Sequence, residues 1–443
     1  MSENNIIHKS LKIRLYPNRE QSIFLNRNFG CCRLMYNERL SDHIEWYNQN
    51  KDLPKAERSK FRGKLPKQLR EEKYDFLGEV IAETLINSQR DCEQALSNFF
   101  QSHTGKRRGR KVGFPKFKSK KQHRDSFTCY VISESLLNWD HRTIKIPKLG
   151  KVRFKHAEDK KGKWISWFKE AIPKHITVSK NPAGEYWCSI LFEKQEDIYS
   201  TIKLDNATGL DFSPNSLYIN DLNEVAPNYR KAKQENQKKL TKLQRNLARK
   251  QKGSKNREKA RIKLARHEQY IANIRRDYRE KETLRLVKTY DLIGIEDLNL
   301  IGLSRMSRNA KNYLDTSWYS FVTRLEEKAK YNNCVVIKAD RFYPSSKTCN
   351  HCGYIKKDLK LSDRKWTCPE CGAEVVRDQN AALNLKENAQ KVLVDNIKST
   401  LLLEQEEVRS VEDIEVNLFN GEIYGVSFEA ENLSSDALKG NSR

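Results

Sequence analysis

The chain has 443 residues, of which 84 are Lys or Arg and 58 are Asp or Glu, so its formal net charge is +26. Its mean hydropathy is −0.83, and no apolar run approaches the ~20 residues that cross a bilayer, which excludes an integral membrane protein. The N-terminus lacks the apolar segment of a secretory signal, and we expect a soluble intracellular protein of about two to four domains. So positive a charge favours a polyanionic partner, because neutralising phosphates releases counterions, and nucleic acid is a better candidate than an anionic membrane surface.

The N-terminal part predicts a strand and two helices. Apolar and basic residues alternate over 10–16, which predicts a half-buried strand ending at Pro17. From Arg19 to Tyr47 apolar residues recur at spacings of three and four, which predicts an amphipathic helix. A second helical pattern covers about 78–101.

A basic segment follows at 106–124, with ten Lys or Arg residues and no acid. Two phenylalanines interrupt it, and aromatic rings between cations suit stacking on bases together with phosphate contact. A solvated basic loop is the alternative interpretation. The residues expected to contact nucleic acid are Arg107, Arg108, Arg110, Lys111, Phe114, Lys116, Phe117 and Lys118.

The middle of the chain changes from β-structure to helix. Short alternating segments with Gly and Pro turns over 126–193 predict a small β-barrel or an open sheet, which the strand at 10–16 joins. Residues 230–281 then hold 20 Lys or Arg against 5 Asp or Glu, and their apolar spacing on either side of the turn KGSKN predicts a basic helical hairpin. Phosphate contact is expected at Lys252, Lys255, Arg257 and Lys259.

Three carboxylates stand at the edges of apolar segments rather than inside charged runs. Asp211 follows the apolar start of a strand in TGLDFS, Glu296 ends the strand LIGIE, and Asp378 opens a helix in VVRDQNAA. Taken singly, Asp378 could be a helix N-cap and Glu296 a strand-end ion-pairing residue, with Asp297 as its rival. As a set, acids beside a core need cationic partners, which are either Lys and Arg or a divalent metal. Carboxylates suit magnesium, and two magnesium ions held by shared carboxylates can hydrolyse a phosphodiester.

The ten cysteines fall into two groups. Four of them have the spacing C-x2-C-x15-C-x2-C, which is typical of a structural four-thiolate zinc ribbon; a redox pair is the less favoured alternative. These four are Cys349, Cys352, Cys368 and Cys371. The other six lie in apolar or mixed contexts and are expected to pack as small hydrophobic residues: Cys31, Cys32, Cys92, Cys129, Cys188 and Cys334.

Glycine follows each cysteine pair, at Gly353 and Gly372. A knuckle turn at these positions favours a residue without a Cβ atom. His351 lies between two cysteines and is expected to be exposed rather than coordinating.

The ordered segments GLDFS, GIEDL, CNHC, CPEC and RDQNAA resemble the RuvC-type nuclease core of the TnpB (OrfB-like) proteins of insertion sequences, which are relatives of the type V CRISPR effectors. KIRLYPNREQ, GFPKFKSK, KGSKNREKARIKLAR, SWYSFVTRLEEKAK and YPSSKTCNHCG match in the same order, so the resemblance covers about 8–390. It departs from the family at Val376, where Asp is frequent, and at Ser213, where Gly is common. Neither change removes an expected catalytic group.

The resemblance implies an RNase H-like fold and an RNA-guided DNA endonuclease of the prokaryotic cytoplasm or nucleoid. A guide RNA would pair with double-stranded target DNA beside a short recognised motif, and cleavage would follow. Carried over by motif, Asp211, Glu296 and Asp378 are the catalytic magnesium ligands. A compact type V CRISPR effector, a guided repressor without cleavage and a strand-joining transposase are the alternatives, and whether a monomer or a homodimer binds the RNA stays open.

The expected fold class is therefore multidomain, α+β and α/β. Its expected parts are a wedge-like β-barrel domain (1–17 and 106–205) with an inserted helical recognition domain (18–105), a RuvC-like nuclease domain (206–343 and 374–390) with an inserted zinc ribbon (344–373), and an acidic tail (391–443). The tail holds 5 Lys or Arg against 11 Asp or Glu and is expected to be disordered.

Overall fold

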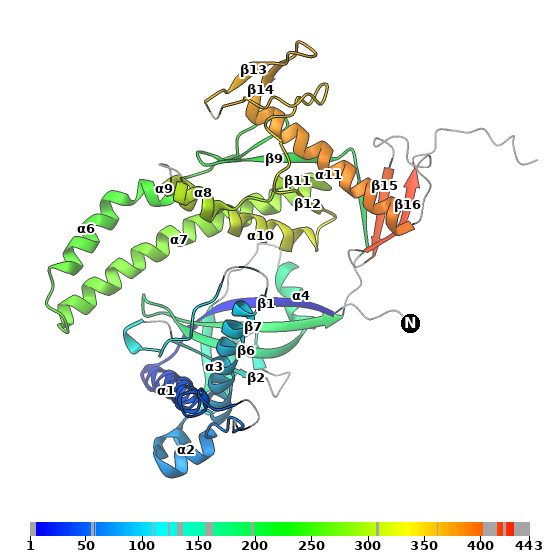
Figure 1. Cartoon of the computed structure of the whole chain (residues 1–443). Helices are drawn as coiled ribbons and strands as arrows, with labels where there is room; N and C mark the ends of the chain where they lie inside the picture. The colour runs from blue at the N-terminus through cyan, green and yellow to red at the C-terminus, as the bar shows by residue number, and fades with distance from the viewer. Residues whose placement is uncertain are drawn as a thin grey trace, which may run out of the picture. The chain divides into compact units, whose positions relative to one another are not determined.

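The computed structural model describes residues 6–428 with short gaps at 55–56, 58, 108, 110, 123–124, 131–135, 156–162, 196–198, 307–309, 361, 402–413 and 420–421. The chain divides into two compact units, Met1–Glu196 and Asp197–Arg443. Both units combine helices with β-sheet, as the expected α+β class requires (Figure 1). None of the described helices is both long and apolar enough to cross a membrane.

Seven antiparallel strands form the sheet of the first unit. They are β1 (Ile6–Tyr16), β2 (Asp125–Tyr130), β3 (Leu137–Asn138), β4 (Thr143–Ile146), β5 (Gly150–Lys155), β6 (Ile172–Lys180) and β7 (Tyr186–Gln195), in the order β2-β6-β7-β1-β5-β4-β3. The strand expected at 10–16 is thus the middle of a longer β1, which joins the other strands as predicted. Within the described residues β2 and β3 are the end strands, so the open sheet rather than the closed barrel is observed.

Helices of the first unit pack against this sheet. They are α1 (Arg19–Asn50), α2 (Pro66–Glu72), α3 (Ala82–His103) and α4 (Lys163–Glu170), with short 3-10 turns η1 (Asp75–Glu79) and η2 (Lys120–Gln122). α1 begins with a capping box, in which the Asn18 side chain accepts from the Gln21 backbone N–H and the Gln21 side chain accepts from that of Asn18. The two helices predicted near 19–47 and 78–101 are therefore confirmed as α1 and α3.

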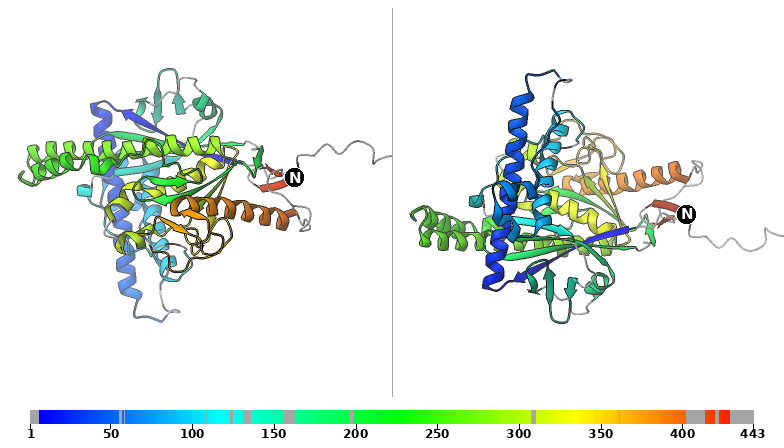
Figure 2. Two further views of the ribbon diagram at one scale, coloured as in Figure 1. Left: turned by 90° about the horizontal axis from the view of Figure 1, so that it is seen from above. Right: turned by 90° about the horizontal axis from the view of Figure 1, so that it is seen from below.

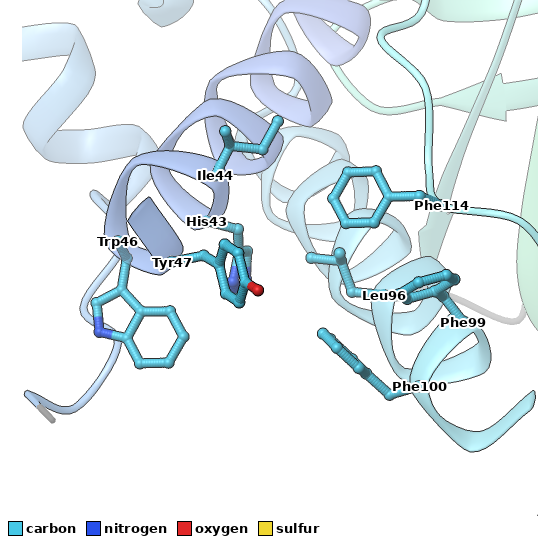
Figure 3. Close-up of a pocket in the computed structure, with 8 residues that line it drawn as sticks. All are labelled: His43, Ile44, Trp46, Tyr47, Leu96, Phe99, Phe100 and Phe114. Carbon is cyan, nitrogen blue, oxygen red and sulfur yellow. The ribbon is translucent and has the colours of Figure 1, made fainter. Parts of the chain in front are cut away.

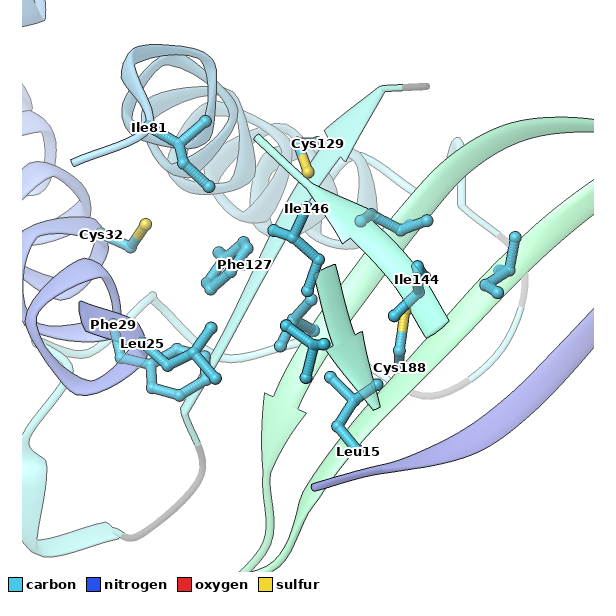
Figure 4. Close-up of a cluster of buried hydrophobic side chains, with 14 of the residues drawn as sticks. Leu15, Leu25, Phe29, Cys32, Ile81, Phe127, Cys129, Ile144, Ile146 and Cys188 are labelled. Carbon is cyan, nitrogen blue, oxygen red and sulfur yellow. The ribbon is translucent and has the colours of Figure 1, made fainter. Parts of the chain in front are cut away.

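One core joins these helices to the sheet. Figure 4 shows Leu25 and Phe29 of α1 gathered with Phe127, Ile144 and Cys188 of three different strands. A boundary at residue 105 consequently cuts through this shared core, although α1 and α3 also bury a smaller cluster of their own, formed by Tyr36, Leu40, Cys92 and Leu96. The predicted helical and β domains form a single compact unit.

The six cysteines outside the ribbon are buried, as predicted. Burial raises the pKa of Cys129 and of Cys334 to about 12, which leaves both thiols protonated at neutral pH. These residues therefore behave as small hydrophobic side chains rather than as reactive thiols.

The second unit is built on a four-stranded sheet of order β10-β9-β11-β12. Its strands are β9 (Ala207–Ser213), β10 (Leu217–Asn220), β11 (Leu292–Glu296) and β12 (Val335–Ala339). β10 is antiparallel to β9, whereas β9, β11 and β12 run parallel to one another. Its helices are α5 (Ala232–Glu235), α6 (Gln237–Ala248), α7 (Lys255–Thr289), α8 (Leu300–Met306), α9 (Ala310–Thr316), α10 (Trp318–Ala329) and α11 (Arg377–Leu401).

The predicted basic hairpin is formed by α6 and α7, which lie side by side (Figure 2). Leu240 of α6 and Ala265 and Ile271 of α7 are buried, as the apolar spacing on the two sides of the turn predicts. The Ser254 side chain accepts from the Arg257 N–H and so caps α7 directly after the turn.

Two glycines let α11 lie directly on the sheet. Gly209 of β9 and Gly294 of β11 are paired in register. A Cβ atom added at Gly209 would stand 1.8 Å from the carbonyl oxygen of Ala382, and one at Gly294 would stand 2.1 Å from that of Leu385. Because both obstacles are helix backbone, only glycine permits this approach.

The predicted disorder of 391–443 is wrong for the described part of that segment. α11 continues to Leu401, and β15 (Ile414–Phe419) pairs with both β16 (Glu422–Phe428) and β8 (Tyr199–Lys203). β8 therefore belongs to the second unit and not to a β domain that extends to 205. Buried Val416 and Leu418 share a core with Leu393 and Ile397 of α11, which explains why an acidic segment is ordered here.

We expect Gly294→Ala to destabilise the second unit by about 1–3 kcal/mol, because α11 must move away from the sheet to admit the methyl group. Thermal unfolding of the purified protein measures this effect. The matched control is Gly30→Ala in α1, where the nearest atom to an added Cβ is 3.9 Å away. Equal melting temperatures for the two variants would contradict the packing role of Gly294.

Candidate active site and metal centre

Two of the predicted acids occupy adjacent strands at the same level of the sheet. In the parallel pair β9–β11, Leu210 lies opposite Ile295, and the next residues are Asp211 and Glu296. Side chains alternate along a strand, so Asp211 shares the face of Gly209 and Glu296 shares the face of Gly294. Both carboxylates therefore point to the face that α11 covers.

α11 brings the third acid to the same place. Ala382 lies against Gly209, and Asp378 stands one helical turn before it, whereas Asp211 stands two residues beyond Gly209 on the strand. Burial raises the pKa of Asp211 well above its ordinary value, and the negative charges of Glu296 and Asp378 raise it further. The three residues singled out from the sequence thus form one electrostatic cluster.

Glu296 is held by a serine that the sequence did not single out. The Ser345 hydroxyl donates to Glu296 Oε1 at 2.7 Å, and the Ser345 carbonyl accepts from Asn384 Nδ2 of α11 at 2.7 Å. Burial raises the pKa of Glu296, although this hydrogen bond and the charge of Arg377 act in the opposite direction. The motif YPSS marked this serine in the sequence, but only the fold shows that Glu296 is its hydrogen-bond partner.

Asp378 faces an arginine that sequence reasoning also missed. Arg364 Nη1 lies 3.2 Å from each carboxylate oxygen of Asp378. The Arg364 carbonyl accepts from the Arg377 N–H at 2.9 Å, which ties the segment before β13 (Lys365–Thr367) to the start of α11. Asp297, the rival to Glu296, instead pairs with Arg341 at 2.5 Å.

The four predicted ligand cysteines converge on one point. Their sulfur atoms all lie within 4.8 Å of one another. The Sγ atoms of Cys349 and Cys371 are 3.8 Å apart, and those of Cys352 and Cys368 are 3.5 Å apart. Tetrahedral coordination with Zn–S bonds of about 2.3 Å requires sulfur separations of about 3.8 Å. The cluster could therefore hold a zinc ion, with all four positions taken by protein.

The predicted knuckle turns are confirmed at both pairs. Gly353 and Gly372 have φ angles of 76° and 71°. The Gly353 N–H donates to the Cys349 carbonyl at 2.8 Å, and the Gly372 N–H donates to that of Cys368 at 2.9 Å. His351 is exposed, as expected.

A stripe of asparagines on α11 attaches the cysteine cluster to the acid site. Asn380 and Asn384, one turn apart and both buried, each donate to the Thr348 carbonyl at 2.7 Å. The Asn380 side chain also accepts from the Asn350 N–H at 3.0 Å, between the first two cysteines. One helix therefore orients Asp378, Ser345 and the first cysteine knuckle together.

The predicted nucleic-acid contacts lie in different surroundings. Arg108 and Arg110 are outside the described residues, whereas the other predicted contacts of the loop are exposed, namely Arg107, Lys111, Phe114, Lys116, Phe117 and Lys118. Lys118 is fixed against α1, with its Nζ 3.8 Å from the ring centroid of Tyr36. Arg257 donates to the carbonyls of Leu247 and Lys250, each at 2.8 Å, so it closes the hairpin. Exposed cations of the hairpin turn are Lys252, Lys255 and Lys259.

Family models match three stretches of the chain. A probable transposase model matches 189–307, a Cas12f1-like TNB domain matches 318–385, and a helix-turn-helix domain matches 2–52. Within the last range the described residues form strand β1 and the single long helix α1. The TNB match, 318–385, includes all four clustered cysteines and Asp378.

Two relatives that match most of the chain agree with these family models. A Streptomyces pristinaespiralis protein named as an RNA-guided DNA endonuclease is 32% identical over 86% of this chain and 89% of its own length. Escherichia coli InsQ, with the same description, is 29% identical over 91% of this chain and 98% of its own. A cryo-EM structure of a Cas12f1–sgRNA–target DNA complex covers 86% of this chain and 99% of that one, with a TM-score of 0.47 and 12% identity.

The family models and the two relatives assign this protein to the class of nucleases encoded by insertion sequences. The chain belongs to the TnpB (OrfB-like) family of RNA-guided DNA endonucleases.

We expect the purified protein to contain one zinc ion per chain, because the four sulfur atoms lie within 4.8 Å of one another, close enough to share one tetrahedral ion. Cys349→Ser should lower the zinc content in elemental analysis and loosen the ribbon. His351→Ala, which changes an exposed neighbour inside the same knuckle, is the control and should keep the zinc. A zinc-free wild-type protein with an unchanged melting temperature would contradict the assignment.

Proposed function

We propose that this protein is a magnesium-dependent, RNA-guided DNA endonuclease whose phosphodiester-hydrolysing site consists of Asp211, Glu296 and Asp378. The supporting observation is the matched level of Asp211 and Glu296 on parallel strands, with α11 lying across both. Rigid strands and a closely packed helix hold the carboxylates in place, as a metal site requires. Asp211 receives the charge of both other acids and is the central ligand of the set.

The charge balance at the site supports a divalent cation. Burial and mutual repulsion make the ionised form of Asp211 unfavourable, although the chain carries a net charge of +26. Carboxylate oxygens are ligands that magnesium prefers. When bound, two magnesium ions would activate the attacking water and stabilise the leaving oxygen of the phosphodiester. A cation at Asp378 would compete with Arg364 for the same two oxygens.

The cysteine cluster is proposed to serve as a structural zinc ribbon. Four thiolates close the coordination shell and leave no position for water or substrate. Its contacts with Asn380 and Asn384 let the ribbon fix the start of α11, where Asp378 stands. Zinc would thus affect catalysis only by holding α11 and Asp378 in position.

Guide RNA and target DNA are the proposed partners. Cations at Lys238, Lys242, Arg245 and Arg249 recur along one side of α6, at the spacing of successive helical turns. Such a stripe suits the phosphates of an RNA–DNA heteroduplex, because a protein recognises this duplex by its sugar-phosphate backbone rather than by its base sequence. The exposed cations of the hairpin turn join this stripe as the proposed phosphate contacts of the second unit, and those of the 106–124 loop are the proposed phosphate contacts of the first unit.

The domain assignment follows from the same proposal. We assign the first unit to a wedge-like β domain with its recognition helices, and the second to a RuvC-like nuclease domain with its inserted ribbon. The mixed order β10-β9-β11-β12, with acids on β9 and β11, supports the nuclease assignment.

We expect Asp211→Asn to lower cleavage of a guide-matched plasmid in magnesium by at least about 1,000-fold, because the central metal ligand is lost. Guide-RNA binding should be unchanged. The melting temperature of the metal-free protein should rise, since removing one charge relieves the repulsion that raises the pKa of Asp211. Gel assays of cleavage and RNA binding, with calorimetry, measure the three effects.

The matched control is Asp297→Asn, which neutralises the acid next to Glu296 that pairs with Arg341. It should retain nearly full cleavage. The site assignment fails if Asp211→Asn cuts at the wild-type rate. Guided binding without any cutting by the wild-type protein would instead indicate a repressor.

Ser345→Ala should raise the magnesium concentration for half-maximal cleavage by about 10-fold, because groups that orient metal ligands typically contribute this much. Ser345→Thr, which keeps a hydroxyl, should restore much of the affinity. Ser346→Ala is the neighbouring control. A magnesium titration of cleavage rates checks all three, and identical titration curves for Ser345→Ala and wild type would exclude the positioning role.

A further inference from the structure

An aromatic pocket lies in the first unit, between α1, α3 and the basic loop. Its volume is about 440 Å³, and its walls carry the rings of Trp46, Tyr47, Phe99, Phe100 and Phe114. Figure 3 shows Trp46 and Tyr47 on α1 across the pocket from Phe99 and Phe100 on α3, with Phe114 of the loop beside them. The volume falls within the ~300–1,000 Å³ of small-molecule sites, enough for a flat base with its sugar.

These rings are available to a ligand. Tyr47, Phe100 and Phe114 are 57%, 55% and 45% exposed, which is high for aromatic side chains that stand together. Phe99 fixes two of the walls, with its ring centroid 5.2 Å from that of Phe100 and 5.3 Å from that of Phe114. The pocket is therefore preformed and open.

The wall of the pocket carries no charge at neutral pH. His43, the titratable imidazole of the lining, stacks on Phe61 with ring centroids 3.5 Å apart. Burial, and then the charge of Arg39, lowers its pKa to about 4, so this ring stays neutral. The ligand must consequently present a flat apolar face rather than a charged group to the pocket itself.

The loop that contributes Phe114 to the pocket is strongly cationic in sequence. Phe114 belongs to the 106–124 loop, which contains ten Lys or Arg residues and no acid. Lys111 and Lys116 flank it in sequence and are exposed. A ligand that combines a flat apolar face with an adjacent negative charge matches this arrangement, and a nucleotide within a strand is such a ligand.

We propose that this pocket binds an unpaired base of a single-stranded nucleic acid by stacking, while the loop cations hold the neighbouring phosphates. The proposal rests on the proposed function only in taking nucleic acid as the partner. The base must be unpaired and unstacked, because the faces of bases in a duplex are covered by their neighbours. Since the rings offer a π-face rather than a hydrogen-bonding pattern, binding tolerates any base.

The test measures binding of a fluorescein-labelled oligouridine and of the same strand with abasic sites. It uses the full chain in buffer without added magnesium, which prevents cutting. The wild-type protein should prefer oligouridine over the abasic strand. The double variant Tyr47→Ala, Phe100→Ala should bind oligouridine about 5- to 150-fold more weakly, the range of one stacked base, and should lose this preference. Because no cation is removed, the dependence of affinity on salt should not change.

Two controls separate stacking from charge and from folding. Tyr130→Ala removes a tyrosine of the same unit that is 53% exposed and lies outside the pocket, and it should bind like wild type. Lys111→Ala, Lys116→Ala should reduce the salt dependence but keep the preference for bases. Circular dichroism of each variant establishes that the fold is retained.

Three outcomes would overturn the proposal. The first is a pocket variant that binds oligouridine as Tyr130→Ala does, and the second is an equal loss on oligouridine and on the abasic strand. The third is an unchanged base preference together with loss of a concentration-dependent dimer, which would make the pocket an interface between copies of the chain. Failure of the nuclease assignment is separate, because it is read from cleavage by Asp211→Asn and not from base preference.

Discussion

The second unit depends on the contact between α11 and the glycine pair of β9 and β11. A helix backbone approaches the sheet so closely that a single methyl group at Gly209 or Gly294 would overlap a carbonyl oxygen. Two residues beyond each glycine, on the same face, stands an acid, and one turn before the contact on α11 stands the third. Because of the residue spacing along the strands and along the helix, the close contact of α11 with the sheet also brings the three carboxylates together.

Different faces of α11 make different contacts. Alanine and leucine residues cover the sheet, whereas the buried side chains of Asn380 and Asn384 bind the backbone around Thr348 and Ser345. Buried amides leave unpaired groups if either partner moves, so this side of the helix tolerates little displacement. The soft thiolate cluster and the hard carboxylate cluster are in this way coupled through one rigid element, although they suit different metals.

Charge is distributed according to these roles. The acids proposed to bind metal lie beside a core, where burial and repulsion raise the pKa of Asp211. The cations instead occupy exposed turns, one side of α6 and the 106–124 loop. In the first unit, a neutral aromatic pocket adjoins such a loop, which separates contacts with bases from contacts with phosphates. An uncharged pocket beside a basic surface lets base stacking and phosphate binding contribute independently.

Much of the site could be predicted from the sequence because its signals are local. The cysteine spacing, the knuckle glycines and the acids at the ends of apolar strands each depend on a few neighbouring residues, as do β1, α1, α3 and the basic hairpin. The sequence did not identify Ser345, Arg364 or Asn384 as partners of the site, because each meets its counterpart only after distant segments pack together. Nor did local composition predict that β15 and β16 extend the second unit, since their order comes from pairing with β8 and packing against α11. Residue type and spacing determined the chemistry available to this protein, and the tertiary structure decided which groups act together, because hydrogen bonds and charge repulsion depend on distances that only packing sets.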